Sequence, residues 1–429
     1  MKTVFIKRLV AQGLACALLV FTAYGADEAV IHQAIAEAAG KGGGIARIPA
    51  GVYELTRSIT IPEGVELTGE SETAVVLTVP QDAPFPAIVL DHARHAGVSR
   101  LQLVEKDHRY KGKSPALLIQ GNSRFVAVRE VSTTGFSAGF LVGRSETGTS
   151  RGLVFEACRA EAAAYFGFDL NHVETVTLEH CYSFRHRLDG IKFRKKVRDV
   201  TVLGGDSSYN GAYSRDLNGN AIDGYAGANA ASVYSMVAEG NNGSGFYFKT
   251  GPLSLKDFGY VRNLYFVDVR ARENRTSGID LNRSGGDTIK RGQTELPPLL
   301  NHAVVIGGIG ERNGASGYYV RGRSVALITP FASGNGAHGM DLASAWDTTV
   351  IVPTVRHSAA AGIRIGVDPV KGIARRVSIL GGHVDDSPES CLVGPESRHI
   401  LIEQLTGGSF SVAPEATSTT RMIPSDPLP

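Results

Sequence analysis

A short pattern recurs along most of the chain and constrains its fold more than any other feature. Each copy has a small residue first, apolar residues second and fourth, and variable residues third and fifth, as in Gly167-Phe-Asp-Leu-Asn171. Successive copies begin 22 to 39 residues apart. Because so short a unit cannot bury an apolar face alone, the pattern indicates units that stack on one another. The other copies begin at Ala87, Ala116, Gly139, Gly190, Ala221, Gly245, Gly278, Gly317, Gly339, Gly362 and Ser390.

A second alternation of apolar residues lies between the copies, as in Leu153-Val-Phe155 and Val200-Thr-Val202. Alternation with a period of two predicts strands that have one buried face. An asparagine also recurs four residues before the small residue, where it suits a left-handed turn and can form a ladder of amides. Together these features predict an all-β chain, a parallel β-helix solenoid of about twelve rungs with two or three strands each. The ladder residues are Asn241, Asn274, Asn313 and Asn335.

Residues 1–25 have the features of a secretory signal peptide. Lys2, Lys7 and Arg8 precede an apolar run from Leu9 to Phe21, and a small-residue cleavage site follows it. The run is shorter than the ~20 residues that a bilayer span requires. We therefore expect an exported protein, periplasmic or secreted, with no membrane span.

Residues 26–410 are predicted to form one β-helix domain. A helix over Asp27 to Ala39, where apolar residues recur at helical spacing, is expected to cap its N-terminal end. The segment 411–429 is rich in Pro, Ser and Thr and is predicted to be a flexible tail. The domain is expected to be a monomer.

Charge and cysteine content exclude other classes. The formal net charge of +2 is far from that of a basic nucleic-acid-binding protein, so no nucleic-acid partner is expected. Three cysteines follow the signal segment, an odd number that does not indicate a disulfide framework. Cys158 and Cys181 lie one repeat apart, so we expect them to stack as buried thiols, with a disulfide as the alternative.

Five short motifs precede the first copies of the repeat: Ala34-Ile35, Gly42-Gly43-Gly44-Ile45, Ile48-Pro49-Ala50-Gly51-Val52-Tyr53, Ile59-Thr60-Ile61-Pro62 and Val65-Glu66-Leu67-Thr68-Gly69. This series resembles the N-terminal part of the pectate-lyase-like right-handed parallel β-helix superfamily. The resemblance implies a right-handed solenoid that binds or acts on carbohydrates, because members are largely polysaccharide lyases, hydrolases, epimerases and phage tailspikes. A shared fold does not by itself define an activity.

The variable positions of each copy are expected to point outward, because the apolar positions on either side point into the core. Stacking rungs ~4.8 Å apart turns each variable position into a column on the solenoid wall. Both columns are rich in polar and aromatic residues over the same central rungs. The third-position column contains Asp169, Lys192, Asp223, Tyr247, Asp280, Tyr319, Asp341 and Arg364, and the fifth-position column contains Asn171, Arg194, Tyr225, Lys249, Asn282 and Arg321.

Acids, bases and tyrosines side by side suit a sugar polymer, because charged groups bind hydroxyls and carboxylates and tyrosine rings stack on sugars. Insertions at the same rungs, after Gly190, Gly245 and Gly278, would form loops that border a groove. These loops include Ser207 to Tyr213, Arg215-Asp216, Lys256-Asp257, Arg283 and Lys290-Arg291. The alternative is a ladder of cross-strand charge pairs with no ligand. The residues expected to bind substrate are Asp169, Asn171, Tyr225, Asn282, Arg283, Tyr319, Arg321 and Asp341.

The lysines and arginines of the two columns favour an acidic, uronate-containing polysaccharide as the substrate. The reaction that we expect is cleavage by β-elimination. This chemistry needs a base and a cation that neutralises the carboxylate. Lys249 is the expected base, with Tyr247 as second choice, and Arg194 the expected neutraliser. Lys192 lies beside them, and Asp223 and Asp280 would set the pKa of Lys249. Calcium is an alternative neutraliser, but Lys192 between its candidate ligands Asp169 and Asp223 would repel the ion, so no metal and no required cofactor is predicted.

Other activities stay open at this point. Asp223 and Asp280 are two rungs apart, about 9.6 Å along the column, which is compatible with an inverting glycoside hydrolase. A uronate C5-epimerase needs the same base as a lyase, and a non-catalytic polysaccharide-binding module would carry the same strip. Of the histidines, His186 occupies a ladder position and is expected to be structural. His338, at a corner near Asp341, is expected to be a solvated turn residue, with a side chain that reaches the groove as the alternative.

Overall fold

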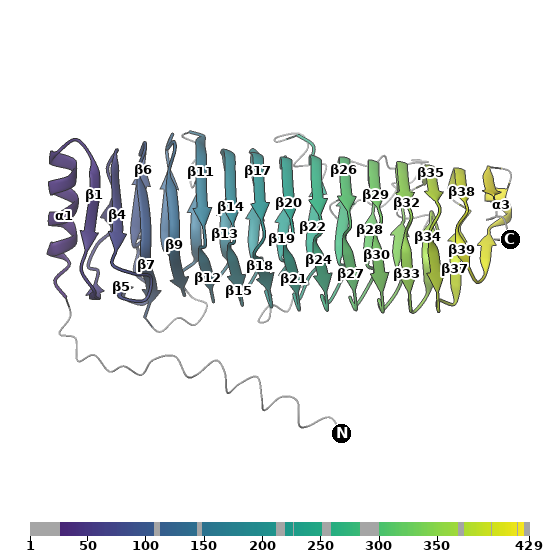
Figure 1. The fold of residues 1–429 in the computed structure, drawn as a ribbon, viewed down its shortest axis with the longest axis horizontal. Helices are drawn as coiled ribbons and strands as arrows, with labels where there is room; N and C mark the ends of the chain where they lie inside the picture. Colours follow the sequence, from purple (N-terminus) through teal and green to yellow (C-terminus); the bar gives the residue numbers. More distant parts are fainter. Residues whose placement is uncertain are drawn as a thin grey trace, which may run out of the picture.

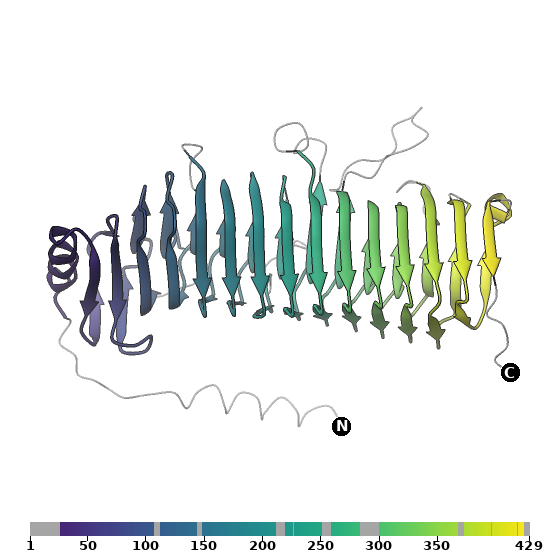
Figure 2. The same ribbon diagram turned by 45° about the horizontal axis from the view of Figure 1, so that its top comes forward.

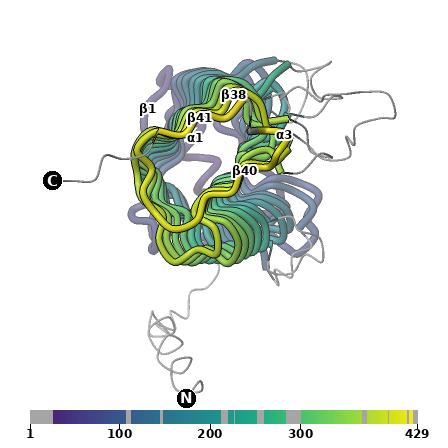
Figure 3. Tube along the Cα trace, turned by 90° about the vertical axis from the view of Figure 1, so that its right-hand side faces the viewer, coloured from purple at the N-terminus to yellow at the C-terminus, as the bar shows by residue number. Residues whose placement is uncertain are grey.

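The computed structural model describes residues 26–106, 112–143, 148–211, 219–225, 227–250, 259–283, 300–367, 373–395, 397–417 and 419–423. These residues form a right-handed parallel β-helix, in which rungs stack along one long axis (Figures 1 and 2). Viewed along that axis, the rungs superimpose around a common interior (Figure 3). The predicted signal peptide lies outside the described residues. No helix in the described part of the chain is long and apolar enough to cross a bilayer.

Fourteen strands form one parallel sheet, here called sheet B, and they include every copy of the repeat. The copies account for β6 through β37, and one further strand lies at each end of the sheet. In order the strands are β3 (Ile59–Thr60), β6 (Ile88–Asp91), β8 (Leu117–Gln120), β10 (Ala138–Val142), β13 (Phe166–Leu170), β16 (Ile191–Phe193), β19 (Ile222–Gly224), β22 (Phe246–Thr250), β25 (Ile279–Arg283), β28 (Tyr318–Val320), β31 (Met340–Leu342), β34 (Ala361–Ile365), β37 (Glu389–Val393) and β40 (Phe410–Val412).

The second sheet, sheet A, has 27 strands in the described residues. Most rungs contribute a longer and a shorter strand to it, separated by a bend. The longer strands are β1 (Gly44–Ile48), β4 (Val65–Gly69), β7 (Gly97–Glu105), β9 (Ala127–Thr134), β11 (Ser150–Glu156), β14 (Val173–Glu179), β17 (Val197–Leu203), β20 (Asn229–Tyr234), β23 (Arg262–Val267), β26 (Leu300–Ile306), β29 (Gly322–Ile328), β32 (Trp346–Ile351), β35 (Ala374–Leu380), β38 (Ser397–Glu403) and β41 (Thr420–Ile423). The others are β2 (Gly51–Glu54), β5 (Val75–Val79), β12 (Arg159–Glu161), β15 (Tyr182–Phe184), β18 (Asp206–Ser208), β21 (Val237–Glu239), β24 (Arg270–Arg272), β27 (Ile309–Glu311), β30 (Phe331–Ser333), β33 (Thr354–Arg356), β36 (His383–Asp385) and β39 (Thr406–Gly407).

The interior consists of apolar side chains stacked from rung to rung. Phe140 lies on Phe168 of the next rung with ring centroids 4.7 Å apart, for example. Cys158 and Cys181 are buried free thiols, and each Sγ donates to a backbone carbonyl oxygen. The prediction of stacked thiols is confirmed.

An asparagine ladder holds one corner of the solenoid. Asn241 donates its side-chain amide to Asn274 Oδ1 at 2.9 Å, and Asn274 donates in turn to Asn313 Oδ1 at 3.0 Å. The ladder begins one rung earlier than predicted, at Asn210, which donates to Asn241 Oδ1. Asn210 belongs to the segment that is expected to form an inserted loop, but its side chain lies at the corner, where the amide of Asn241 can accept its hydrogen bond. Ser207 and Ser208, from the same expected loop, are strand residues of β18.

His186 continues this corner toward the N-terminus. Its Nδ1 accepts the backbone N–H of Ala163 at 3.0 Å, and its Nε2 lies 2.9 Å from Ser183 Oγ. Burial lowers the pKa of His186 to about 3. The imidazole is therefore neutral at physiological pH, and its predicted structural role is confirmed.

The two ends of the solenoid differ. Helix α1 (Ala29–Gly40) lies across the first rung (Figure 1), and its buried Ile31, Ile35 and Ala38 belong to the same apolar core as β1. At the other end, β40, the short helix α3 (Pro414–Thr417) and β41 occupy part of the segment that we predicted as a flexible tail from residue 411. Strand β41 pairs with β38, so the β-helix extends to Ile423. Composition misled here, because polar residues on an outer rung face water without leaving the sheet.

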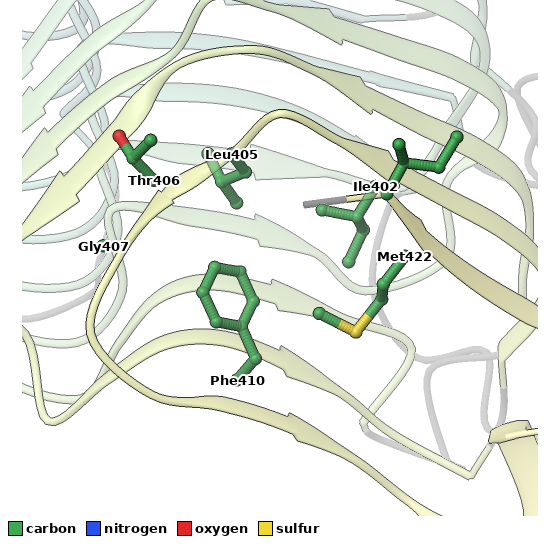
Figure 4. A pocket seen from close by; sticks show the side chains of 7 residues that line it. Ile402, Leu405, Thr406, Gly407, Phe410 and Met422 are labelled. Atoms are coloured by element: carbon green, nitrogen blue, oxygen red, sulfur yellow. The ribbon is translucent and has the colours of Figure 1, made fainter. Parts of the chain in front are cut away.

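A pocket of about 350 Å³ lies at this C-terminal end (Figure 4). Ile402, Leu405, Phe410 and Met422 line it, and all four are apolar. It lies against the last described rung, and its described lining contains no group for acid–base chemistry.

Candidate functional site

The register of sheet B aligns the whole third-position column. Each of its residues is the direct pairing partner of the next, from Asp169 opposite Lys192 to Asp341 opposite Arg364. The insertions that vary the interval between copies lie between strands and leave this register intact. The intervening pairs are Lys192–Asp223, Asp223–Tyr247, Tyr247–Asp280, Asp280–Tyr319 and Tyr319–Asp341.

The four aspartates of the third-position column are buried, although the variable positions were expected to be exposed on the outer face of the sheet. Asp169, Asp223, Asp280 and Asp341 are only 3%, 2%, 9% and 2% exposed. Because stacked rungs are ~4.8 Å apart, each short acid lies between longer side chains of the rungs above and below. A buried carboxylate must be paired or protonated, so its neighbours determine its charge.

Asp169 is held by the residue predicted to neutralise the substrate. Arg194 donates Nε to Asp169 Oδ1 at 2.8 Å and also contacts Oδ2, and Asn171 donates to Oδ1 at 2.9 Å. The positive charge of Arg194 is therefore matched within the protein. The geometry favours a structural pair here over a free cation for a substrate carboxylate.

A cluster of four charges occupies the next three rungs. Lys192 contacts Asp223 and lies 3.0 Å from Asp189 Oδ2, and Lys249 lies 3.3 Å from Asp223 Oδ2. Burial alone would lower the pKa of Lys192, but Asp189 and Asp223 outweigh it and raise that pKa. Asp189 also accepts two hydrogen bonds from Asn220. Asp189 was not among the predicted site residues, although its position three residues before Lys192 is a usable signal.

Lys249, the predicted base, is already engaged. Its ammonium group pairs with Asp223 and lies over the Tyr247 ring, 4.2 Å from the centroid. An ammonium group has no lone pair with which to accept a proton. Tyr247, the second choice, is an equally poor base, because burial and the charge of Asp280 raise the pKa of its phenol. Both side chains are better suited to donate hydrogen bonds or positive charge.

Asp280 differs from the other acids of the column, because no basic side chain forms an ion pair with it among the described residues. Its direct neighbours in the column are Tyr247 and Tyr319, and Ser244 Oγ donates to its Oδ2 at 3.3 Å. In the described part of the chain its Oδ1 has no hydrogen-bond partner. Burial raises the pKa of Asp280 from 3.8 to about 7, although Ser244 and the charge of Lys249 act in the opposite direction.

Asp280 opens onto a pocket of about 390 Å³ on the outer face of sheet B. Asn282, Tyr319, His338 and Arg364 also line this pocket, and Arg364 is paired with Asp341 through both of its carboxylate oxygens. His338 is buried, and its Nδ1 lies 3.1 Å from the backbone N of Ala361. The expected solvated turn histidine is therefore wrong, because the imidazole is buried against the backbone of Ala361. The alternative, a side chain that reaches the groove, agrees with the place of His338 in the pocket lining.

Several predicted features lie outside what can be described. The side chain of Arg283 is one, and the residues of the expected border loops at 212–218, 251–258 and 284–299 are the others. Tyr225 is within reach of the site, since Lys249 Nζ lies 5.7 Å from its ring centroid. No group of three His, Cys, Asp or Glu side chains in the described residues could hold a metal ion. The candidate calcium ligands Asp169 and Asp223 do not fit that role, because basic side chains already occupy both.

An Asp280→Asn variant is expected to be more stable than the wild type at pH 8 and equally stable near pH 4. Because the pKa of Asp280 is higher in the folded state than 3.8, its stabilising contribution is complete below that value and is lost as pH rises through about 7. An amide does not ionise and escapes this loss, which amounts to as much as ~4 kcal/mol at ~1.4 kcal/mol per pKa unit. Thermal unfolding between pH 4 and pH 8 measures the difference.

The matched control is Asp341→Asn, which leaves Arg364 without its carboxylate and is expected to destabilise the protein at pH 8. A difference between Asp280→Asn and the wild type that does not change with pH would contradict the assignment.

No protein-family model and no curated protein matches the chain by sequence. Solved structures match its fold. The A-module of the Azotobacter vinelandii mannuronan C-5 epimerase AlgE4 is 16% identical with a TM-score of 0.56, over 92% of this chain and 98% of that one. The periplasmic alginate epimerase AlgG is 10% identical with a TM-score of 0.54, over 83% and 78%. Tailspike protein 3 of bacteriophage CBA120 is 13% identical with a TM-score of 0.56, over 92% and 58%.

At these identities the likeness concerns the fold alone. The resemblance of the N-terminal motifs to the right-handed parallel β-helix superfamily is confirmed at that level.

Proposed function

We propose that this protein is a carbohydrate-active enzyme that binds a uronate polysaccharide along the outer face of sheet B and removes the C5 proton of one sugar with Asp280. The observation that carries the proposal is the state of Asp280, a buried carboxylate facing a pocket with a pKa of about 7. A base is most effective when its pKa lies near the working pH. Perturbed carboxylates in a cleft are typical of catalytic groups.

In this mechanism the ionised Asp280 takes the proton from C5, next to the sugar carboxylate, and the electron pair moves onto that carboxylate. Lys249 and Arg321 are close enough for their charges to act on Asp280, and they stabilise the resulting dianion. The protonated phenol of Tyr247 donates a hydrogen bond on the preceding rung. Such positioned donors and charges contribute most when the site excludes water.

The dianion has two fates. If the C4–O bond breaks and the leaving oxygen takes a proton, the product is an unsaturated uronate, which is β-elimination. If a proton returns to C5 from the opposite face, the product is the C5 epimer. Two of the similar structures are alginate epimerases, which supports a shared first step without selecting between the two outcomes.

Inverting hydrolysis is the second candidate, and one observation favours it. Asp223 forms ion pairs with Lys192 and Lys249, whereas Asp280 has no basic partner among the described residues and a pKa of about 7. Two carboxylates in such different surroundings on one face are the pattern of a glycosidase base and acid. In this reaction Asp223 would activate a water and Asp280 would protonate the leaving oxygen.

Incubation with alginate and polygalacturonate tests the proposal. Ultraviolet absorbance detects unsaturated uronates, a reducing-end assay detects any cleavage, and incorporation of deuterium at C5 detects epimerisation. We expect absorbance or deuterium to rise. Reducing ends without absorbance would replace proton abstraction with hydrolysis, and no change in any of the three would overturn the proposed activity on these polymers.

The direction of the pH profile separates the two candidates. If Asp280 is the base, kcat/KM is expected to fall tenfold per pH unit below about pH 7, because the carboxylate must be ionised. If Asp280 is the acid of a hydrolase, kcat/KM falls above about pH 7 instead. A profile that is flat between pH 5 and pH 9 would contradict both roles.

A further inference from the structure

Ser244 connects Asp280 to the preceding rung of sheet B. Ser244 lies two residues before β22 and is 3% exposed. Its Oγ lies 3.3 Å from Asp280 Oδ2 and 2.7 Å from Thr276 Oγ1. Because a hydroxyl has only one hydrogen, Thr276 must be the donor to Ser244 while Ser244 donates to Asp280. Both hydroxyls therefore donate in the direction of the carboxylate.

The backbone of Ser244 is fixed by Asn220, which is also buried. The backbone N–H of Ser244 donates to Asn220 Oδ1 at 2.7 Å, and Asn220 Nδ2 donates to Asp189 Oδ1 at 2.9 Å. Since the amide oxygen faces a donor and the amide nitrogen faces a carboxylate, only one orientation of the Asn220 side chain satisfies both neighbours. Gly243 leaves room for this side chain, because a Cβ at that position would lie 2.4 Å from Asn220 Oδ1. The position of Ser244 is thus set by a buried network that includes the ion pair of Asp189 and Lys192.

The network gives the two oxygens of Asp280 different surroundings. Oδ2 accepts the hydrogen bond from Ser244, whereas Oδ1 has no hydrogen-bond partner in the described part of the chain. Rotation of the carboxylate would break the contact at Oδ2, so this hydrogen bond keeps Oδ1 as the oxygen available to a substrate. A hydrogen bond to the charged form also favours ionisation, and Ser244 lowers the pKa of Asp280 while burial raises it.

We infer that Ser244 is a positioning residue for Asp280, which holds one carboxylate oxygen and leaves the other for the sugar, and that Asn220 and Thr276 hold Ser244 in place. The inference rests on the proposed function for the role of Asp280 in the reaction. The hydrogen bonds themselves belong to the folded protein, so they can be tested without a substrate.

Other charged and titratable groups also face Asp280, and the test must leave them unchanged. The charges of Lys249 and Arg321 lower the pKa of Asp280, as Ser244 does. A substitution at Ser244 replaces none of these groups, so a change in the titration of Asp280 reports the lost hydrogen bond. The groups are Tyr247 and Lys249 of β22, Tyr319 of β28, Arg321, which follows β28, and His338 and the Asp341–Arg364 pair of the pocket lining.

A Ser244→Ala variant tests the inference with two readouts. The limb of the kcat/KM profile that reports Asp280 is expected to move upward by about one to two pH units, because a hydrogen bond to a charged group is lost. Thermal unfolding gives the second readout without a substrate. A raised folded-state pKa stabilises fully below the unfolded value, and this contribution is lost as pH rises through the folded value. The stability difference between Ser244→Ala and Ser244→Ala/Asp280→Asn is therefore expected to keep growing to a higher pH than the difference between the wild type and Asp280→Asn.

The matched control is Ser397→Ala in β38. Ser397 is also a buried serine, and its Oγ donates to the carbonyl oxygen of Ile365 at 3.1 Å. Its replacement is expected to leave both pH dependences in place. Thr276→Val is a second variant, which is expected to fold because Thr276 is only half-buried. We expect it to move both readouts in the same direction by less than about one pH unit, because Ser244 keeps its contact with Asp280 but loses its own donor.

Equal pH dependences in the wild type, Ser244→Ala and Thr276→Val would overturn the inference, and so would an equal shift in Ser397→Ala. A shift in the unfolding readout with an unchanged kcat/KM profile in an active enzyme would overturn the role of Ser244 in the reaction. Wild-type protein that acts on no polysaccharide would overturn the proposed function, but the unfolding readout would still report the network. The two failures are therefore distinguishable.

Discussion

An Asp280→Asn variant is expected to turn over substrate between a hundredfold and ten-thousandfold more slowly than the wild type at pH 7, the ~10²–10⁴ range usual for loss of a general base or acid. The amide keeps the shape of the side chain and its contact with Ser244 but cannot exchange a proton. Initial rates on the polymer identified in the panel give the ratio. Because the same variant is expected to be more stable at pH 8, lost activity cannot be attributed to unfolding, and this combination is typical of a catalytic residue.

Glu389→Gln is the matched control for this experiment. Glu389 is an acid on the same sheet, in β37, where it accepts a hydrogen bond from Ser411 Oγ at 3.0 Å. Its replacement is expected to change turnover less than about twofold, as is usual for substitutions away from a site. Comparable rates for the wild type and Asp280→Asn would remove Asp280 from the mechanism and return attention to Asp223.

An Asn274→Ala variant is expected to lose about 3 to 9 kcal/mol of unfolding free energy, because three buried partner residues lose hydrogen bonds worth ~1–3 kcal/mol each. The side chain of Asn274 bridges three rungs. It accepts hydrogen bonds from the backbone and side-chain amides of Asn241 and donates to Asn313 Oδ1 and to the carbonyl oxygen of Ala238. Alanine leaves buried polar groups without partners, and denaturant unfolding measures the cost.

Gln33→Ala serves as the comparison, because Gln33 also has an amide side chain but donates an exposed hydrogen bond, to Glu37 Oε1 at 2.9 Å. We expect it to lose less than ~1 kcal/mol. Equal losses in the two variants would mean that the ladder contributes no more than an ordinary surface contact.

The residues on the outer face of the solenoid were predictable, because the strand period of two decides which side chains point outward and the constant rung spacing decides which of them become neighbours. Asp169 and Arg364 are seven rungs apart along the third-position column, yet the register that joins them followed from the repeat alone. The insertions did not disturb it, because they lie between strands. The asparagine ladder was predictable for the same reason, apart from Asn210.

The protonation states within that face were not predictable. Lys249 and Asp280 lie on adjacent strands, yet Lys249 pairs with Asp223 and no basic side chain of the described residues pairs with Asp280. The position of a lysine ammonium group depends on side-chain torsions that no repeat encodes. Asp189 and His338 lie near corners, where small changes in backbone angles decide which way a side chain points. The sequence therefore predicted which few rungs carry the charged residues, but it did not predict which of these residues could act as the general base.

Rung-by-rung pairing also has a consequence for how the chain reaches its folded state. Among the described residues, each strand pairs only with strands of the rungs before and after it, so strand pairing joins residues about one repeat apart and does not join the first rung to the last. The closure entropy per rung is then nearly constant, however many rungs have formed. A chain of this kind can fold by adding one rung at a time. Helix α1 covers the first rung, and each completed rung exposes an apolar layer on which the next segment packs. Ile402 and Phe410 in Figure 4 belong to such a layer.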